Sequence, residues 1–465
     1  MAVQEKQKKT YTPSISYGGE VLEYKDAPLA ITTTEPYKCI HCSEDITIKQ
    51  IKDVVSGIDE TVAKKVLVKL NKYKKEGKFK LDNCLRKAHF ITQVASETQF
   101  SSMKESGYYP YGRLQRLSNF TVTPQTINST ILTSLEKHLS EIFEIRDKND
   151  KKLSKTNSQI KQIVKDASIT YDIREMYGYR RDKKKKYLPE KNIKEVMETV
   201  KNAKGDEIEQ IKYKIIIKKR TKAYSLEILS RAYASRMNNG NELSRDGYKF
   251  SGKGIKQLTG KNNYTNFTNR RKALGFPDYD KHIDFTVTTN SSTLEGNYDK
   301  LADKDNVTYG VQAAIWYWLE GNGKIYSYSD DDNVAEVSYR INGGWNGFAD
   351  GDYPRKKGIL KARKAFKVYD HYKLVHENGT QAEKDKVIEI LSRISKKHSK
   401  RGKTIEKDPE AEKLLKELRT VKLVELKPMP METIELKFDI PKLQPVPVTA
   451  TTSSKSKKKR KKKRK

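Results

Sequence analysis

The segment HFITQVASETQFSSMKESGYY, residues 89–109, changes character halfway along. Its first half continues an apolar pattern with a spacing of three to four residues, which predicts a helix from about Asp82 to Glu97. Its second half is rich in Ser, Thr, Gln and Tyr and contains a second glutamate, Glu105. We expect the helix to break in this Ser/Gly-rich stretch, because an unbroken helix would hold the two carboxyl groups about 12 Å apart along its axis.

The residues around this segment predict a helical bundle. Thr47-Ile-Lys-Gln50 has the pattern of a capping box at the start of one helix. The expected buried positions of this helix are Ile48, Ile51, Val54, Val55 and Ile58. Those of the next are Val62, Val66 and Leu70. The predicted stripe of the third helix is Leu85, Ala88, His89, Thr92 and Ala95.

Two further helices are predicted near the end of the bundle. YGVQAAIWYWL, residues 309–319, predicts a buried helix that ends before Gly321 and Gly323. Residues 334–341 predict another that leads directly into Asn342-Gly343-Gly344. The fold class expected for the chain is therefore mainly α.

Composition suggests five regions. Residues 1–37 are polar and predict a flexible leader, and 38–372 contain the predicted globular domain. Within that domain, 145–222 is rich in charge and predicts a mostly helical or partly ordered insertion. Residues 373–426 predict a charged helical extension, and 427–465 combine a Pro-rich segment with a polybasic tail.

The charge balance predicts contact with polyanions. Apolar residues make up 35% of the 465 and charged residues 33%, so one core is expected but not dense packing over the whole length. The formal charge of +34 favours nucleic acid, anionic lipid or the anionic polymers of a bacterial envelope, without choosing among them. The basic tail is expected to add nonspecific polyanion contacts. The oligomeric state stays open.

The sequence contains no recognisable targeting segment. Its start, MAVQEKQKKTYTPS, lacks the apolar stretch of a signal peptide, and no apolar run approaches the length needed to span a bilayer. We expect synthesis in the cytoplasm, with action on a cell wall only after lysis or dedicated export.

Three cysteines raise the question of a metal. Cys39 and Cys42 have the spacing of a zinc half-site or a redox pair. A tetrahedral structural zinc needs four ligands, which Cys84 with His41 or His89 could complete. Because no second pair has zinc-finger spacing, reduced thiols without a metal are the favoured interpretation, and no cofactor is expected.

A Gly-rich stretch, residues 246–264, offers groups that suit a sugar. Gly252 and Gly254 permit close backbone approach, and neutral hydrogen-bonding side chains follow at Gln257, Thr259 and Asn263. Amides and hydroxyls beside aromatic rings match hydroxyl and N-acetyl groups, whereas a phosphate cradle would need a missing GKS or GKT ending. The alternative is a Gly/Asn-rich turn before a helix. Asn342 has a similar ambiguity, since it could cap a helix or hold an N-acetyl group.

Together these stretches resemble glycoside hydrolase family 19, the chitinases and related phage-type endolysins. The family order is a helix ending in H-E-T or H-E-S, a second glutamate, G-R-G-x-x-Q-L-[ST]-x-x-x-N-Y, and then I-N-G-G. The matching residues here are Ser96-Glu97-Thr98, Glu105, the segment from Gly252 to Tyr264, and Ile341-Asn342-Gly343-Gly344. Arg236-Met-Asn-Asn239 similarly resembles the endolysin-type R-x-G-N. The resemblance covers about 40–130 and 223–370.

The resemblance implies a lysozyme-like helical domain that cleaves β-1,4 bonds next to N-acetylglucosamine by inversion, without a metal. Glu97 would be the general acid and Glu105 the base, and inversion requires their carboxyl groups about 6.5–9.5 Å apart. Thr259 would help to hold the attacking water. The implied substrate-binding residues are Tyr248, Lys253, Gln257, Thr259, Asn263, Tyr264 and Asn342. The short spacing from Glu97 to Glu105 resembles the endolysin branch, which favours peptidoglycan over chitin.

Departures from the family pattern define the alternatives. Ser96 replaces the family's His, Lys253 replaces the Arg of G-R-G, and Asn238 replaces the Gly of R-x-G-N. A lysine does not reproduce the planar fork of an arginine. A catalytically inactive wall-binding or structural protein is therefore the alternative of another class, and a nucleic-acid binder is a third interpretation based on charge.

Overall fold

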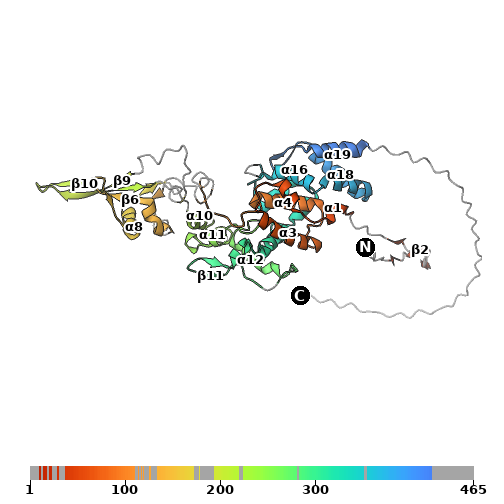
Figure 1. Ribbon diagram of the computed structural model, residues 1–465, viewed down its shortest axis with the longest axis horizontal. Coiled ribbons are helices and arrows are strands. Elements are labelled where there is room, and N and C mark those ends of the chain that lie inside the picture. The colour runs from red at the N-terminus through yellow and green to blue at the C-terminus, as the bar shows by residue number, and fades with distance from the viewer. Residues whose placement is uncertain are drawn as a thin grey trace, which may run out of the picture. The chain divides into compact units, whose positions relative to one another are not determined.

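The computed structural model describes residues 37–109, 134–171, 193–218, 224–279, 282–349 and 353–420 (Figure 1). It also describes short strands at 10–11, 14–17, 20–23, 29–30 and 125–126, and residues 114, 117, 119 and 177. Of the predicted leader, only those first four strands and residue 37 are described. The predicted Pro-rich segment and polybasic tail, 427–465, lie outside the described residues.

Helices make up about half of the described body and small sheets a lesser part, which agrees in part with the expected fold class. They are α1 (Ile40–Ser43), α2 (Ile48–Val54), α3 (Glu60–Lys75), α4 (Cys84–Thr98), α7 (Leu139–Ile142), α8 (Asn157–Asp166), α10 (Ser225–Ala232), α11 (Asp246–Lys249), α12 (Lys261–Arg271), α13 (Thr308–Glu320), α14 (Ile325–Asp330), α15 (Val334–Asn342), α16 (Arg355–Ala365), α17 (Val368–Asn378), α18 (Gln381–Ile394) and α19 (Pro409–Thr420). Short 3-10 helices cover Glu136–His138, Glu242–Ser244 and Asn297–Ala302.

The strands pair antiparallel, and all except β9 and β10 are short. They are β1 (Thr10–Tyr11), β2 (Ser14–Tyr17), β3 (Glu20–Glu23), β4 (Leu29–Ala30), β5 (Gln125–Thr126), β6 (Phe143–Arg146), β7 (Lys152–Leu153), β8 (Thr170–Tyr171), β9 (Ile193–Lys201), β10 (Glu207–Ile217), β11 (Thr288–Asn290), β12 (Glu295–Gly296), β13 (His398–Lys400) and β14 (Lys403–Ile405). β7, β6, β10 and β9 form a four-stranded sheet in that order, and the remaining strands form two-stranded pairs.

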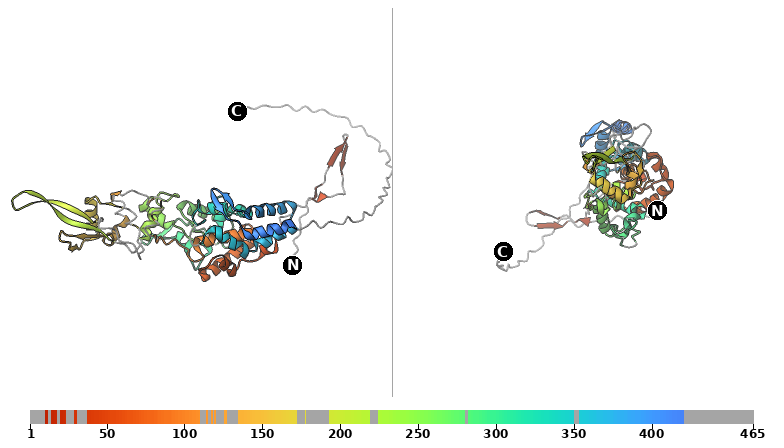
Figure 2. Two further views of the ribbon diagram at one scale, coloured as in Figure 1. Left: turned by 90° about the horizontal axis from the view of Figure 1, so that it is seen from above. Right: turned by 90° about the vertical axis from the view of Figure 1, so that its left-hand side faces the viewer.

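Helix α4 lies at the centre of the larger core. It begins after Asn83, whose side chain accepts a hydrogen bond from the Arg86 amide at 2.7 Å, as an N-cap should. It packs against α2, α14, α15, α16 and α17, so both early and late parts of the sequence cover it. Figure 2 shows the red and orange early helices and the blue late helices within the same body. All five residues of the predicted stripe are buried, which confirms that prediction.

Three more of the predicted helices are also confirmed. Thr47 and Gln50 form the expected reciprocal capping box at α2. α13 covers the predicted buried helix and ends at a Gly321 cap, and α15 covers the predicted 334–341 helix. Their caps are encoded within a few residues, which explains why the sequence predicts them well.

The prediction of a mostly helical insertion at 145–222 is wrong for its second half. β9 and β10 form a long antiparallel hairpin, and β10 also pairs with β6. Among the described residues of this range, α8 and the single residue Tyr177 are helical. β-branched residues such as Ile215 and Val196 alternate with lysine and glutamate here, and this period of two fits a pleated strand rather than a helix. A second core cluster, separate from the larger one, joins this sheet to α8 and α10.

A buried ionic network ties α4 to the late helices. Asp332, which is fully buried, contacts the His89 ring at 2.8 Å and receives two bonds from Arg363, each 2.9 Å long. The Tyr372 hydroxyl donates to the same carboxylate at 2.8 Å. Burial alone would raise the pKa of Asp332, but Arg363 and then His89 outweigh it and hold that pKa well below its usual range.

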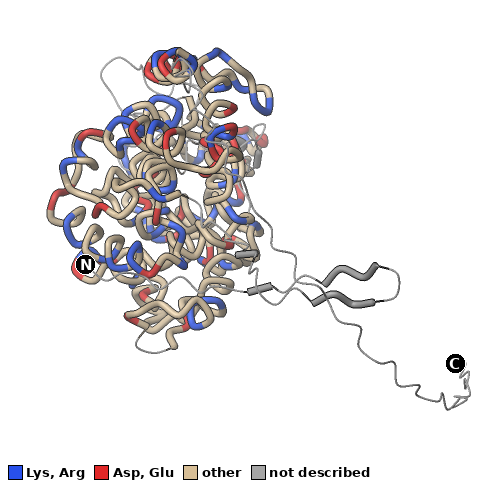
Figure 3. The backbone as a smooth tube through the Cα atoms, turned by 90° about the vertical axis from the view of Figure 1, so that its right-hand side faces the viewer, with Lys and Arg blue, Asp and Glu red and all other residues tan. Residues whose placement is uncertain are grey.

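Charged residues are spread over the described body. Figure 3 shows Lys and Arg distributed over the helices with Asp and Glu among them. None of the described helices combines the length and apolar character that crossing a bilayer requires.

Candidate active site

The chain reverses direction immediately after Glu97, as expected from the sequence. α4 ends at Thr98, and both Gln99 and Phe100 adopt left-handed backbone conformations, with φ of 52° and 55°. Such conformations cost a residue with a side chain about 1–2 kcal/mol each. Burial of the Phe100 ring, which is 0% exposed, helps to offset this cost. The helix break therefore rests on a packed aromatic anchor.

The reversed segment pairs with the Gly-rich stretch. The Glu105 amide donates to the Gly252 carbonyl at 2.8 Å, and the Gly254 amide donates to the Met103 carbonyl at 2.8 Å. Lys104 and Lys253 form an antiparallel bridge between these two bonds. Glu105 is thereby placed against the stretch that the sequence analysis assigned to sugar binding.

The two glycines of this stretch lie close to other parts of the chain, and a contact with backbone restricts Gly254 more strongly than Gly252. A Cβ atom on Gly252 would lie 2.7 Å from the Gln257 side-chain oxygen. Gly254 has φ of +75°, and a Cβ there would lie 3.0 Å from the Gly310 Cα. The close approach predicted from these glycines is thus made, within this structure, to the chain itself.

Glu97 is held by a buried cation. Its Oε1 accepts a 2.6 Å bond from Nη2 of Arg355, whose side chain is only 2% exposed while that of Glu97 is 17% exposed. The same guanidinium donates to Gln93 Oε1 at 2.6 Å and to the Asn346 carbonyl at 2.7 Å. Arg355 therefore has a fixed orientation, and it fixes the Glu97 carboxyl group in turn.

Glu105 is held by neutral donors. The Gly252 amide donates to Oε2 at 3.0 Å, and the Tyr233 hydroxyl lies 3.0 Å and 3.2 Å from the two carboxylate oxygens. The Tyr109 hydroxyl makes a short bond to Oε1. Burial, and then the adjacent Glu105 charge, raises the pKa of Tyr233 well above its usual value, so its phenol keeps its proton and remains a donor.

Three of the predicted sugar-binding side chains follow one another along the Gly-rich stretch. Gln257 donates to the Gly254 carbonyl at 3.0 Å, Thr259 to the Gln257 carbonyl at 2.9 Å, and Asn263 to the Thr259 carbonyl at 2.7 Å. All three side chains are partly buried. These local bonds fix their orientation, and their sugar-binding roles stay predictions.

Asn342 takes part in the Glu97 environment. It is the last residue of α15, and its amide donates to the carbonyls of Ser338 at 3.3 Å and Asn346 at 3.0 Å. Its oxygen lies 3.5 Å from Nη2 of Arg355. Gly343, rather than Asn342, is the C-cap residue of α15, and Asn342 lies beside the cation that holds Glu97.

Lys253 and Tyr264, also assigned to sugar, are enclosed. Lys253 is 1% exposed, and its ammonium group donates to the Lys249 carbonyl. Burial lowers its pKa to about 7. Tyr264 is 0% exposed and donates to the Ser251 carbonyl at 2.8 Å. Tyr248 is half-buried, with the Lys104 ammonium 5.2 Å from its ring centre. Lys253 and Tyr264 therefore lie in the interior, where their side chains donate to backbone carbonyls of the Gly-rich stretch.

The sequence analysis missed the groups that hold the two carboxylates. Arg355, Gln93, Tyr109 and Tyr233 have no motif that links them to Glu97 or Glu105, and the ion pair from Arg355 to Glu97 joins positions 258 residues apart. A second cation, Lys256, is partly buried and donates to the Ile341 carbonyl at 3.1 Å. Burial lowers its pKa to about 8, although the charge of Glu97 opposes this shift.

A cavity of about 280 Å³ lies elsewhere, along α16, α18 and the β13–β14 hairpin. Its lining includes Asn333, Lys356, Arg393 and Ser399. Neither Glu97 nor Glu105 lines this cavity, and none of the predicted sugar-binding residues does. Carboxylate pairing and hydrogen-bond geometry, rather than enclosed volume, therefore locate the candidate site.

Comparison with known proteins gives one partial match to a glycoside hydrolase family. No family model matches the chain. Over 120 residues it is 38% identical to a protein from Haemophilus influenzae described as a glycosyl hydrolase family 19 domain-containing protein. That alignment covers 26% of this chain and 46% of the relative, so the chain spans about half of the relative's length. Part of the chain is therefore similar to a family 19 glycoside hydrolase.

Proposed function

We propose that this protein is a glycoside hydrolase that cleaves β-1,4 bonds next to N-acetylglucosamine in a cell-wall polymer, with inversion. One observation carries the proposal. Two carboxyl groups lie on either side of a helix break, one held by a cation and the other by neutral donors, against a stretch of amide and hydroxyl side chains. An acid and a base with different surroundings are what an inverting glycosidase needs.

In this mechanism Glu97 protonates the glycosidic oxygen. Arg355 donates to Glu97 Oε1 and so orients the carboxyl group, which leaves Oε2 as the atom that carries and delivers the proton. Arg355 also stabilises the carboxylate that remains after proton transfer. Gln93 and Asn346 hold Arg355 and act as positioning residues.

Glu105 deprotonates the attacking water in the same step. Its three donors, from Gly252, Tyr109 and Tyr233, satisfy an ionised carboxylate, which is the form that a general base requires. Thr259 follows Gln257 in the stretch beside Glu105 and would help to hold the water. The water attacks the anomeric carbon from the face opposite to the leaving oxygen, so the configuration inverts.

Peptidoglycan is the proposed substrate, and chitin is the alternative with the same chemistry. The net charge of +34 favours an anionic wall over neutral chitin. Access to that wall would follow lysis or dedicated export. A wall-binding protein without catalysis is the second candidate function, because Lys253 is enclosed and its ammonium group is bonded to backbone.

The test measures reducing-sugar release from purified peptidoglycan sacculi and from soluble chitin. We expect the wild type to act on sacculi and Glu97→Gln to lose this activity. Glu410→Gln is the matched control and should leave activity unchanged. Glu410, on α19, forms an exposed ion pair with Lys364 at the end of α16, away from the site.

Three outcomes separate the candidates. Activity on chitin alone would keep the mechanism and change the substrate. Binding to sacculi without hydrolysis at any pH would support the wall-binding candidate. Retention of the anomeric configuration in the first product, followed by NMR, would contradict the inverting mechanism.

A further inference from the structure

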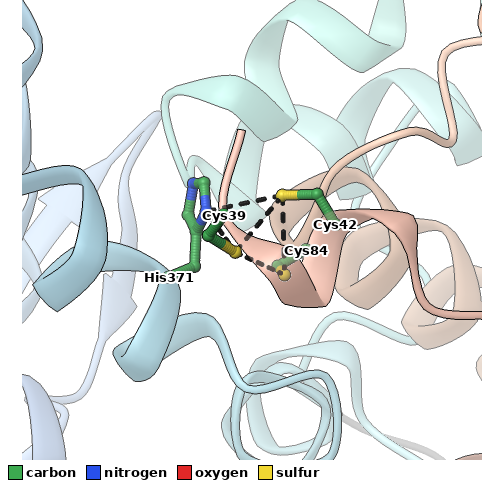
Figure 4. Close-up of side chains that lie close together, drawn as sticks. All are labelled: Cys39, Cys42, Cys84 and His371. Carbon is green, nitrogen blue, oxygen red and sulfur yellow. Dashed lines mark hydrogen bonds between the residues drawn. The ribbon is translucent and has the colours of Figure 1, made fainter. Parts of the chain in front are cut away.

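The three cysteines and one histidine meet in a single buried cluster. Cys39 precedes α1, Cys42 lies within it, Cys84 is the first residue of α4, and His371 lies on α17. Figure 4 shows the three sulfur atoms and the imidazole facing one another. The cysteines are at most 2% exposed and the histidine is 9% exposed. The cluster lies at the opposite end of α4 from Glu97, so it is separate from the candidate active site.

Five of the six distances between the four ligand atoms lie near the edge lengths of a zinc tetrahedron. Sulfur ligands about 2.3 Å from zinc, and a nitrogen about 2.0–2.1 Å from it, give S–S edges of about 3.8 Å and S–N edges of about 3.5 Å. The three Sγ–Sγ distances here are 3.5, 3.8 and 3.8 Å. His371 Nδ1 lies 3.2 Å from Cys39 Sγ and 3.6 Å from Cys42 Sγ. All four ligand atoms lie within 4.8 Å of one another.

A disulfide explains the cluster less well. A disulfide bond needs sulfur atoms about 2.0 Å apart, and all three cysteines are free. Pairing any two would leave the third thiol and the imidazole buried together. Within the described part of the chain, moreover, the side-chain hydrogen bonds of these four groups are with one another. Four metal-ligating atoms drawn together from three separate helices are better explained by a shared cation than by four chance neighbours.

A buried ammonium group supplies the charge that such a site needs. Three thiolates and a neutral imidazole around a divalent cation carry a net charge of −1. Lys87, which is 2% exposed, donates to the carbonyls of Cys42 at 3.3 Å, His41 at 2.7 Å and Glu44 at 3.0 Å. Its positive charge therefore lies against the loop that carries two of the thiols, where a net negative centre would stabilise it.

The two histidines considered from the sequence are held elsewhere. His41 Nδ1 contacts Glu44 Oε1 at 2.8 Å, and His89 Nε2 contacts Asp332 at 2.8 Å. The fourth ligand comes instead from a residue 329 positions after Cys42. Local spacing cannot reveal a ligand at this separation, which is why the sequence favoured thiols without a metal.

We propose that Cys39, Cys42, Cys84 and His371 bind one zinc ion in a closed structural site. All four ligands come from the chain, which leaves no open position for a substrate and excludes a catalytic role for this metal. Thiolate with imidazole favours zinc over magnesium, calcium or manganese. The ion would join α1, the start of α4 and α17, and so anchor the helix that carries Glu97.

The test measures metal content and thiol reactivity of the full chain purified without chelator. We expect about one zinc per chain by elemental mass spectrometry, as a four-ligand site requires. The three thiols should resist a thiol reagent until a chelator is added. Replacement by Co²⁺ should give the visible absorption of a tetrahedral thiolate complex.

Variants then assign the ligands. His371→Ala and Cys84→Ser should lose the retained zinc, whereas His41→Ala should keep it. His41 is the matched control because it lies beside the cluster and is bonded to Glu44 instead. The metal-loaded chain should also melt at a higher temperature than the chelated chain, with no such difference in His371→Ala.

Two results would overturn the proposal. One is a folded wild type that retains no zinc from zinc-supplemented medium while its thiols react freely or form a disulfide between Cys39 and Cys42. The other is zinc binding of equal stoichiometry in wild type and His371→Ala. The wild-type measurements stand even if a variant fails to fold. They are also independent of glycosidase activity.

Discussion

Glu97 and Glu105 lie on either side of one helix break, yet the chain holds them with opposite kinds of group. Glu97 faces a guanidinium that is almost fully buried and is itself fixed by Gln93 and Asn346. Glu105 faces a backbone amide and two phenols, which donate hydrogen bonds without carrying a charge.

The comparison separates two ways of fixing a carboxyl group. A cation binds the charged form tightly, and its removal leaves a cluster of partly buried polar groups without a donor. Each neutral donor stabilises a carboxylate by a smaller free energy than a cation does, so the protein tolerates the loss of one. We therefore expect substitutions near Glu97 to affect folding and those near Glu105 to affect mainly the rate.

The largest effect is expected for Glu105→Gln. The amide keeps the size of the side chain but cannot act as a base, so activity on the responsive polymer should fall by about 10²- to 10⁴-fold. Its melting temperature should stay close to that of the wild type, since the amide oxygen still accepts from Tyr233. Activity within tenfold of the wild type would show that Glu105 is not the base.

Arg355→Met should have the largest effect on stability. The substitution removes the cation from Glu97 and the donors from Gln93 and Asn346, which should lower the free energy of unfolding by about 3–5 kcal/mol. Urea denaturation measures this change. Arg270→Met is the control, because Arg270 pairs with Glu320 at the surface and should cost less than about 1 kcal/mol. Equal losses of unfolding free energy in the two variants would show that Arg355 contributes no more to stability than a surface ion pair does.

The pH dependence of stability tests whether Lys253 adds a charge near Glu105. Burial lowers its folded-state pKa to about 7, below that of the unfolded chain. Between pH 7 and about 10 the unfolded state therefore binds the extra proton, so this residue makes stability rise with pH, by at most about 1.4 kcal/mol per unit. Urea midpoints at pH 7 and 9.5 should show this rise in the wild type.

Lys253→Met should remove that contribution, and Lys49→Met, at an exposed position paired with Asp53, should retain it. An unchanged slope in Lys253→Met would mean that the lysine is charged in the folded protein. Glu105 would then have a cationic neighbour as Glu97 does.

Tyr233→Phe should give the smallest effect. It removes one donor from Glu105 while the Gly252 amide and the Tyr109 hydroxyl remain. The loss of about 1 kcal/mol corresponds to roughly a fivefold fall in kcat. KM should be nearly unchanged, because the hydroxyl contacts the base rather than the sugar. A loss as large as that of Glu105→Gln would make Tyr233 part of the proton-transfer machinery.

The sequence predicts those elements whose signals are local. The capping box at Thr47, the buried stripe of α4 and its end near Glu97 all follow from residues within a few positions of one another. The placement of Glu105 against Gly252 follows less directly, since it depends on a backbone bridge between distant segments.

Elsewhere the determining contacts are long-range. In the insertion, abundant lysine and glutamate obscured the alternating pattern of β9 and β10, whose pairing decides their structure. For the site, Arg355 reaches Glu97 across 258 residues, and no local pattern in either segment encodes that contact. Likewise, no local pattern links His371 to the cysteines that it contacts.

The position of α16 against α4 has a consequence for biosynthesis. The ribosome adds about 5–20 residues per second, so the 258 residues from Glu97 to Arg355 take roughly 13–50 s to appear. Throughout that interval the nascent α4 lacks the partner that covers it and positions its carboxyl group. Until residue 355 has emerged, α4 therefore remains without α16, and chaperones have time to bind it.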